Sequence, residues 1–138
     1  MIKKAGTVLI NKNKIGLIYR DHHDDYTFPK GHLEENESLL ECAIRETNEE
    51  TKREVTVLKS DPIYIDKYKD GSGNDCICYY YLVRDNGHSD NDSWDTHDLI
   101  WTDYNKVGDI LSYDSPKVMW NTIKDEVKEY LEEEWKRK

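Results

Sequence analysis

Three glutamates near the middle of the chain are the residues whose spacing most clearly suggests chemistry. Glu46, Glu49 and Glu50 stand at positions i, i+3 and i+4, so on a helix their carboxylates would share one patch. Like charges at this spacing repel each other, and an exposed acidic helix face is therefore one interpretation. The other is a site for Mg²⁺, because this cation prefers oxygen ligands and binds through a few carboxylates together with substrate phosphates.

The residues that precede these glutamates favour the metal site. Gly31 lies in a Pro-Lys-Gly-His stretch, and glycine lets the backbone approach a ligand closely. Glu37 stands directly before a helix start, and Arg45 directly before Glu46. An arginine among carboxylates can hold them in fixed positions through paired hydrogen bonds.

The spacing of these residues resembles the box of the Nudix (MutT-like) family, G-x5-E-x7-R-E-U-x-E-E-x-G-U, where U is a bulky apolar residue. Residues 31–53 meet the first glycine, both spacings and all five charged positions. Three positions depart from the pattern: Thr47 replaces an aliphatic residue, Lys52 the second glycine and Arg53 the last apolar residue. Glycine there would end the helix in the left-handed conformation, so lysine either costs about 1 kcal/mol or lets the helix run further.

The resemblance implies hydrolysis of a nucleoside diphosphate that is linked to another group. In the family, the glutamates matching Glu46, Glu49 and Glu50 bind a divalent metal, usually Mg²⁺, for which Mn²⁺ can substitute. The carbonyl of the residue matching Gly31 is a further candidate metal ligand. Bound cations of this kind neutralise a pyrophosphate and activate a water molecule.

The same resemblance assigns catalytic roles to four residues. The arginine matching Arg45 orients the glutamates by ion pairing, and the residue matching Glu37 supports the site. Either Glu46 or Glu49 could accept the proton from water, and the sequence leaves this choice open.

The stretch around Lys30 and His32 resembles the opening of the box in dinucleoside tetraphosphate hydrolases, and similar openings occur in decapping and diphosphoinositol-polyphosphate members. Lys30 would then meet phosphate oxygens, and His32 either does the same or only hydrogen-bonds the loop. The favoured substrate is a dinucleoside polyphosphate. The alternatives are a (d)NTP pyrophosphohydrolase and, less favoured, a non-catalytic nucleotide-sensing domain.

Residues outside the box could also contact the substrate. Tyr79 and Tyr81 would share one face of a strand, where they form either an aromatic platform for a base or part of the core. His97 could touch the substrate, and Asp95 or Asp98 could add a metal ligand, although a plain polar loop is the simpler interpretation.

The elements that must position these residues can be predicted from the pattern. Strands are expected at 5–10, 14–19, 55–58, 63–68, 76–83 and 99–101, and polar loops at 21–32 and 86–95. The best helix spans 38–52, where Ser38 and Glu41 form a capping box. Helices are also expected at 104–111 and from Ser115 onward. The order predicts one α/β domain over residues 1–138, an α/β/α sandwich with a mixed central β-sheet flanked by helices.

Composition excludes several classes. The chain has 138 residues and a net charge of −9, which disfavours stable nucleic-acid binding and membrane-surface binding. No apolar run is long enough to span a membrane or form a signal-peptide core, and three cysteines make no disulfide framework. We therefore expect a cytoplasmic protein. The resemblance implies a small nucleotide polyphosphate as its partner, and the sequence leaves open whether the protein is a monomer or a homodimer. Residues 1–33 contain six Lys or Arg and three acids, which predicts a mildly positive wall near the site.

Overall fold

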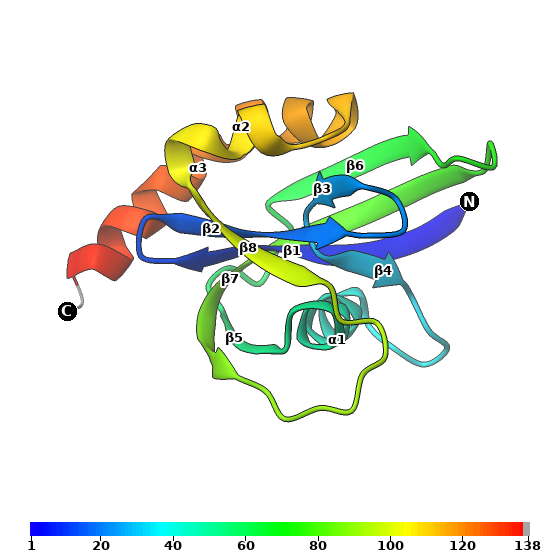
Figure 1. Cartoon of the computed structure of the whole chain (residues 1–138), viewed down its shortest axis with the longest axis horizontal. Coiled ribbons are helices and arrows are strands. Elements are labelled where there is room, and N and C mark those ends of the chain that lie inside the picture. Colours follow the sequence, from blue (N-terminus) through cyan, green and yellow to red (C-terminus); the bar gives the residue numbers. More distant parts are fainter. Residues whose placement is uncertain (137–138) are drawn as a thin grey trace.

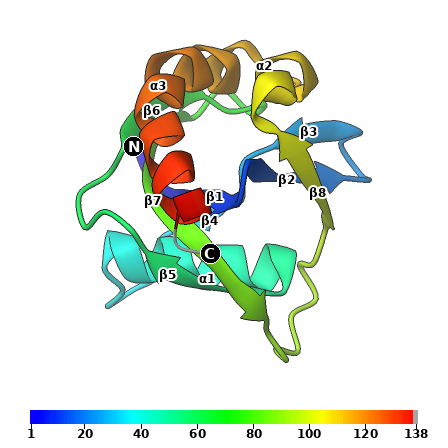
Figure 2. The same cartoon turned by 90° about the vertical axis from the view of Figure 1, so that its left-hand side faces the viewer.

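A computed structural model of the chain describes residues 1–136 and shows a sheet with helices on both faces (Figure 1). The helices are α1 (Leu39–Thr51), the short 3₁₀ helix η1 (Tyr104–Lys106), α2 (Val107–Ile110) and α3 (Asp114–Lys136). Helix α1 covers one face, while α2 and α3 cover the other (Figures 1 and 2). The predicted sandwich is confirmed, and of the predicted tail helix only residues 137 and 138 lie outside the described residues.

Within residues 1–136 the sheet has eight strands. They are β1 (Ile2–Asn11), β2 (Lys14–Arg20), β3 (Asp25–Thr27), β4 (Lys30–His32), β5 (Arg53–Val57), β6 (Tyr64–Lys69), β7 (Asp75–His88) and β8 (Asp98–Asp103). Strand β1 runs parallel to β7, and the other pairings among the described residues are antiparallel. The sheet is therefore mixed, as predicted.

The core lies on both faces of this sheet because successive side chains of each strand point to opposite faces. The larger cluster packs Val8, Tyr80 and Leu82 of the sheet against Met119 and Ile123 of α3. A smaller cluster lies under α1 and consists of Ala5, Cys42, Ala43 and Tyr81. Helix α1 is thus held against the sheet through one apolar stripe, which leaves its polar face free to line a site.

Ser38 caps the start of helix α1 and Lys52 caps its end. The Ser38 side chain accepts the Glu41 N–H at 3.0 Å, and the Glu41 carboxylate accepts the Ser38 N–H at 2.9 Å, which confirms the capping box. At the other end Lys52 adopts the left-handed conformation, with φ 59° and ψ 33°. The helix therefore stops where the family glycine would stop it, and lysine carries the conformational cost.

Two other departures from the family pattern have partners in the structure. The Thr47 hydroxyl is fully buried and lies 2.6 Å from the Thr7 hydroxyl of β1, so its polar atom is satisfied. Arg53 makes two hydrogen bonds of 2.8 Å with the Asp85 carboxylate of β7. The altered box positions therefore form polar links between α1, β5 and the sheet.

The structure differs from the sequence prediction in three segments. The expected loop at 21–32 contains the short strands β3 and β4, the loop after β7 begins only beyond His88, and the expected helix at 104–111 consists of η1 and α2. Strand β4 pairs with β1 opposite Gly6, where a side chain would meet the Pro29 carbonyl at 2.2 Å. These short polar strands depend on distant partners, so their own sequence could not show them.

Cys42, Cys76 and Cys78 are buried free thiols. Among the described residues, no helix is both long and apolar enough to cross a membrane.

Candidate active site

The first residue of the box makes room for the first glutamate. In β4, Gly31 lies directly against the Glu46 side chain of α1, and a Cβ built on this glycine would stand 1.7 Å from Glu46 Oε2. Any larger residue would displace the carboxylate. The glycine predicted to permit close approach therefore does so toward Glu46, a residue of the chain itself.

The backbone of β4 turns its free edge toward α1. Ala5 of β1 pairs with Gly31 of β4. Two hydrogen bonds of 3.1 Å lie on either side of this pair. In one, the Thr7 N–H donates to the Pro29 carbonyl, and in the other, the Leu33 N–H donates to the Lys3 carbonyl. Alternation of antiparallel pairs directs the Gly31 N–H and C=O toward β1. The Gly31 carbonyl as a metal ligand therefore stays a prediction, whereas its role in accommodating Glu46 follows from the geometry.

The polar groups at the free edge of β4 are bound by side chains of α1. The Lys30 N–H donates to Glu50 Oε1 at 2.8 Å, and Arg45 donates to the His32 carbonyl at 3.0 Å. In an extended strand the carbonyl of Lys30 lies on the same side as its N–H, beside Glu50. An edge strand that would otherwise expose unpaired groups is thus covered by the functional face of the helix.

Arg45 connects four of the acidic residues near the site. Its guanidinium donates to both oxygens of Glu37, at 2.6 and 3.0 Å, and to both oxygens of Glu49, at 3.0 and 3.3 Å. Glu46 and Glu34 lie further away, each 3.6 Å from Nη1. The hydrogen bonds from Arg45 also lower the pKa of Glu37. The structure therefore brings together the four residues predicted to be catalytic, with the arginine in an orienting position.

Glu50 is the most deeply buried of the three glutamates, at 8% exposed. Burial, followed by repulsion from Glu46, raises the pKa of Glu50 to about 8 despite the hydrogen bond from Lys30. Burial likewise raises the pKa of Glu46, and only Arg45 opposes this strongly. Both side chains therefore lie where added positive charge would stabilise their ionised forms.

This donor set fits a divalent cation. Carboxylate oxygens are the ligands that Mg²⁺ and Mn²⁺ prefer, and a cation beside Glu46 and Glu50 would offset the cost of burying two negative charges. In the part of the chain that is described, no three His, Cys, Asp or Glu side chains converge closely enough to form a ready-made metal cage. Instead, Glu46 and Glu50 lie against β4, and Glu49 is drawn toward Arg45.

The segment between β7 and β8 brings His97 to the glutamates. The His97 N–H donates to the Glu50 carbonyl at 2.9 Å, and its ring Nε2 lies 3.7 Å from Glu50 Oε2. Thr96 donates to the Glu49 carbonyl at 3.1 Å, and the Asn91 amide donates to the Asn48 carbonyl at 2.8 Å. Figure 2 shows this segment passing the end of α1. Sequence analysis named His97 only as a possible substrate contact, which stays a prediction, and missed Thr96 and Asn91 because nothing in a polar loop indicates its partner.

Not every candidate around this segment reaches the site. Asp95 lies on the exposed loop, close enough to raise the pKa of Glu46 further. Asp98 begins β8, opposite Tyr19 of β2. Neither residue makes a direct contact with the three glutamates in the described structure, so their role as metal ligands stays a prediction.

The aromatic platform proposed for β7 is wrong. Tyr79 and Tyr81 do share one face, but that face packs under α1 with Ala5, Cys42 and Ala43, and Tyr81 is only 5% exposed. Alternation along the strand was predicted correctly. Which helix covers that face depends on the fold, and the core interpretation is the one that holds.

The side chains of Lys30 and His32 point to the face of β4 opposite the one on which Gly31 contacts Glu46. His32 is exposed, yet partial desolvation of its ring and the nearby charges of Lys4 and Lys30 lower its pKa. The Lys30 ammonium lies 5.8 Å from the centre of the Tyr68 ring. It borders a cavity of about 420 Å³ that is also lined by Lys4 and Arg20. Three basic residues of the predicted positive wall thus lie together.

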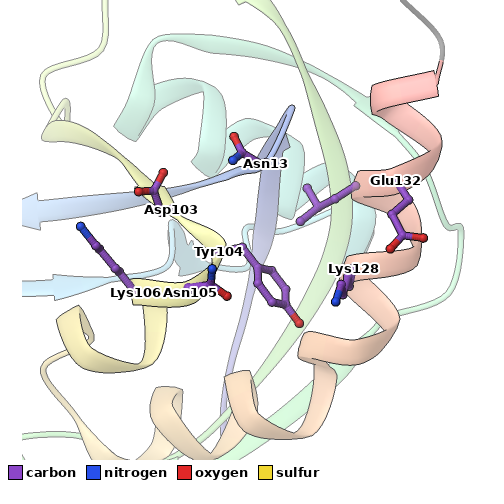
Figure 3. Close-up of a pocket in the computed structure, with 8 residues that line it drawn as sticks. Asn13, Asp103, Tyr104, Asn105, Lys106, Lys128 and Glu132 are labelled. Carbon is purple, nitrogen blue, oxygen red and sulfur yellow. The ribbon is translucent and has the colours of Figure 1, made fainter.

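A second cavity, of about 590 Å³, lies at the other end of the molecule between the β1–β2 turn, the end of β8 and α3 (Figure 3). The Tyr104 ring points into it, and the Tyr104 hydroxyl donates to the Lys124 carbonyl at 2.7 Å. Its lining carries charges of both signs, from Lys106, Lys128, Asp103 and Glu132. No residue of the box lines this cavity, so it does not belong to the carboxylate site.

Comparison with known proteins places this geometry in a family. The family model described as NUDIX domain matches residues 2–125. A solved C. elegans Ap4A hydrolase in a binary complex is 22% identical, with a TM-score of 0.77, over 92% of this chain and 98% of that chain. A mutator MutT protein from Bacillus halodurans is 18% identical, with a TM-score of 0.72, over 90% of this chain and 82% of that one.

A NUDIX hydrolase from Nitrosomonas europaea is 17% identical, with a TM-score of 0.72, over 87% of this chain and 86% of that one. At these identities the solved structures establish a shared fold. Taken with the family match, they support the assignment of a Nudix pyrophosphohydrolase. Because the match extends over most of the chain and the box residues meet at one edge of the sheet, the chain belongs to the Nudix domain family.

Proposed function

We propose that this chain, acting as one domain over residues 1–138, hydrolyses a phosphoanhydride bond in a nucleoside diphosphate-linked substrate with the help of Mg²⁺. One observation carries the proposal. Glu46 lies against Gly31 and Glu50 beside the Lys30 backbone. Glu46 is partly buried and Glu50 is buried, and both have a raised pKa, while Arg45 fixes Glu49 and Glu37 next to them.

Glu46, Glu49 and Glu50 would hold the metal, and the carbonyl groups of β4 are additional candidates. When bound, divalent cations neutralise the pyrophosphate, lower the pKa of a water molecule and stabilise the leaving oxygen. Arg45 keeps Glu49 in place through both of its oxygens. Glu46 has only the 3.6 Å contact with Arg45, so it is the freer acceptor for the proton of the attacking water.

The favoured substrate is a dinucleoside polyphosphate such as diadenosine tetraphosphate. Support comes from the Pro-Lys-Gly-His opening of the box and from the similarity to the C. elegans Ap4A hydrolase. The second candidate is a (d)NTP pyrophosphohydrolase, which the similarity to the MutT protein favours. A small nucleotide is the proposed partner, and the cytoplasmic location and the monomeric or dimeric state remain predictions from the sequence.

A substrate panel tests these alternatives. Formation of AMP and ATP from diadenosine tetraphosphate would support the first candidate, and release of pyrophosphate from a (d)NTP the second. Glu49→Gln should remove most of the turnover, whereas the exposed Glu129→Gln in α3 should not change it. Unchanged turnover in both Glu46→Gln and Glu49→Gln would refute the enzymatic proposal, and nucleotide binding without turnover would favour the sensing domain.

A further inference from the structure

The last turn of α1 is capped by a segment that lies far from it in the sequence. Carbonyl groups at the C-terminus of a helix have no partner within the helix. Here the carbonyls of residues 48–50 accept hydrogen bonds of 2.8–3.1 Å from Asn91, Thr96 and His97. These donors belong to the connection between β7 and β8, residues 89–97, which we call the docking segment.

Lys52 ties the docking segment to the end of the helix. Its ammonium donates to the Asn91 carbonyl, and its own carbonyl accepts the Ser89 N–H at 2.8 Å. Its backbone N–H donates at 3.0 Å to the Asn48 carbonyl, which the Asn91 amide also binds. Lys52, Asn91 and Asn48 are therefore joined in a closed ring of hydrogen bonds.

The side chain of Lys52 makes a contact that the glycine of the box pattern could not make. Lys52 is in the left-handed conformation, with φ 59° and ψ 33°, which glycine adopts without a steric cost. A hydrogen bond from a charged donor is stronger than one between neutral groups. The departure from the pattern thus adds an anchor for the docking segment at the cost of a less favourable backbone conformation.

The docking segment matters to the site because the turn that it caps carries Glu49 and Glu50. Donors at the helix carbonyls restrain this turn and offset the negative end of the helix dipole, which lies beside the two carboxylates. When the segment detaches, the carbonyls return to water and the turn can fray, so that both carboxylates move relative to Glu46. The His97 ring, whose Nε2 lies 3.7 Å from Glu50 Oε2, leaves with the segment.

We infer that Lys52 is a positioning residue, which holds the docking segment on the end of α1 and thereby fixes the turn that carries Glu49 and Glu50. The consequence for metal binding and turnover rests on the proposed function. The attachment of the docking segment does not rest on it, so the two can be measured separately.

Hydrogen exchange of single amides measures this attachment in the absence of metal and substrate. Lys52→Met removes the ammonium and keeps a long side chain, so the Ser89 and His97 amides should exchange about tenfold faster. Lys52→Arg keeps a charged donor and should stay within about threefold of the natural protein. Lys12→Met is the matched control, because Lys12 is exposed in the turn after β1 and has a similar left-handed φ of 57°. It should change neither amide more than about twofold, and equal exchange in Lys52→Met and the natural protein would overturn the inference.

Metal affinity and turnover then test whether the attachment positions the glutamates. Calorimetry should show that Lys52→Met weakens Mg²⁺ binding about tenfold, and kcat for diadenosine tetraphosphate should fall with it while KM changes less than about threefold. Lys52→Gly should lose as much, although it introduces the residue of the box pattern and relieves the backbone cost. Faster exchange with unchanged Mg²⁺ affinity would overturn the positioning role. If the natural protein neither binds Mg²⁺ nor hydrolyses nucleotides, the proposed function fails, while the exchange rates still decide whether Lys52 holds the docking segment.

Discussion

Replacement of Glu50 by glutamine should make the metal-free protein more stable at high pH. The Glu50 pKa of about 8 in the folded protein compares with an ordinary value of 4.5. Because folding raises the pKa of Glu50, the contribution of this side chain to stability is fully present below about pH 4.5 and is lost as the pH rises toward 8. Since one pKa unit corresponds to about 1.4 kcal/mol, ionised Glu50 opposes folding by at most about 5 kcal/mol, and by about 3 kcal/mol at pH 7.

Glutamine removes the charge and keeps an oxygen that can accept the Lys30 N–H. Urea unfolding with EDTA should therefore show similar stabilities of Glu50→Gln and the natural protein at pH 5, and a gain of about 4 kcal/mol for the variant at pH 8. Mg²⁺ should restore much of the difference in the natural protein and little in the variant. Glu129→Gln, exposed on α3, is the control. A difference between Glu50→Gln and the natural protein that does not vary between pH 5 and 8 would refute the reasoning.

Three further substitutions test other contacts of the site. Gly31→Ala places a Cβ 1.7 Å from Glu46 Oε2, so the carboxylate must move. We expect kcat to fall about 100-fold while circular dichroism shows that the fold is retained. A near-normal kcat would contradict this geometry. Arg45→Lys keeps the charge but loses the paired bonds to Glu37 and Glu49, so Mg²⁺ affinity measured by calorimetry should drop about 10- to 100-fold. Thr47→Val leaves the Thr7 hydroxyl without its 2.6 Å partner. The free energy of unfolding, measured with urea, should fall by about 1–2 kcal/mol. The double variant with Thr7→Val should recover part of this loss, and simple additivity of the two changes would show that the hydroxyls are not coupled.

Local signals explain why α1 could be predicted from the sequence in detail. Its capping box, apolar stripe and glutamate spacing all lie within one stretch of chain, and the structure confirms the first directly. The spacing also predicted that Arg45 would lie among carboxylates. What the pattern could not show is that Lys52 ends the helix in the left-handed conformation, because sequence alone left open whether the helix would continue.

Features that depend on distant partners could not be predicted. The three-residue strand β4 exists because β1 offers a pairing edge opposite Gly6, and its own residues read as a loop. The face shared by Tyr79 and Tyr81 was predicted correctly by alternation, but its burial follows from the position of α1. The approach of Lys4 and Lys30 to Tyr68 likewise requires β1, β4 and β6 to be assembled around β7.

The parallel pairing of β1 with β7 has a consequence for the order in which the protein can assemble during synthesis. Ile2 lies opposite Cys76 and Ile10 opposite Arg84. After β1 has been synthesised, it must therefore wait for β7 before its central neighbour exists. Contacts so far apart in sequence slow folding, because a long loop must close before they form. A chain truncated before β7 should therefore remain sensitive to protease, even though it contains the complete Nudix box.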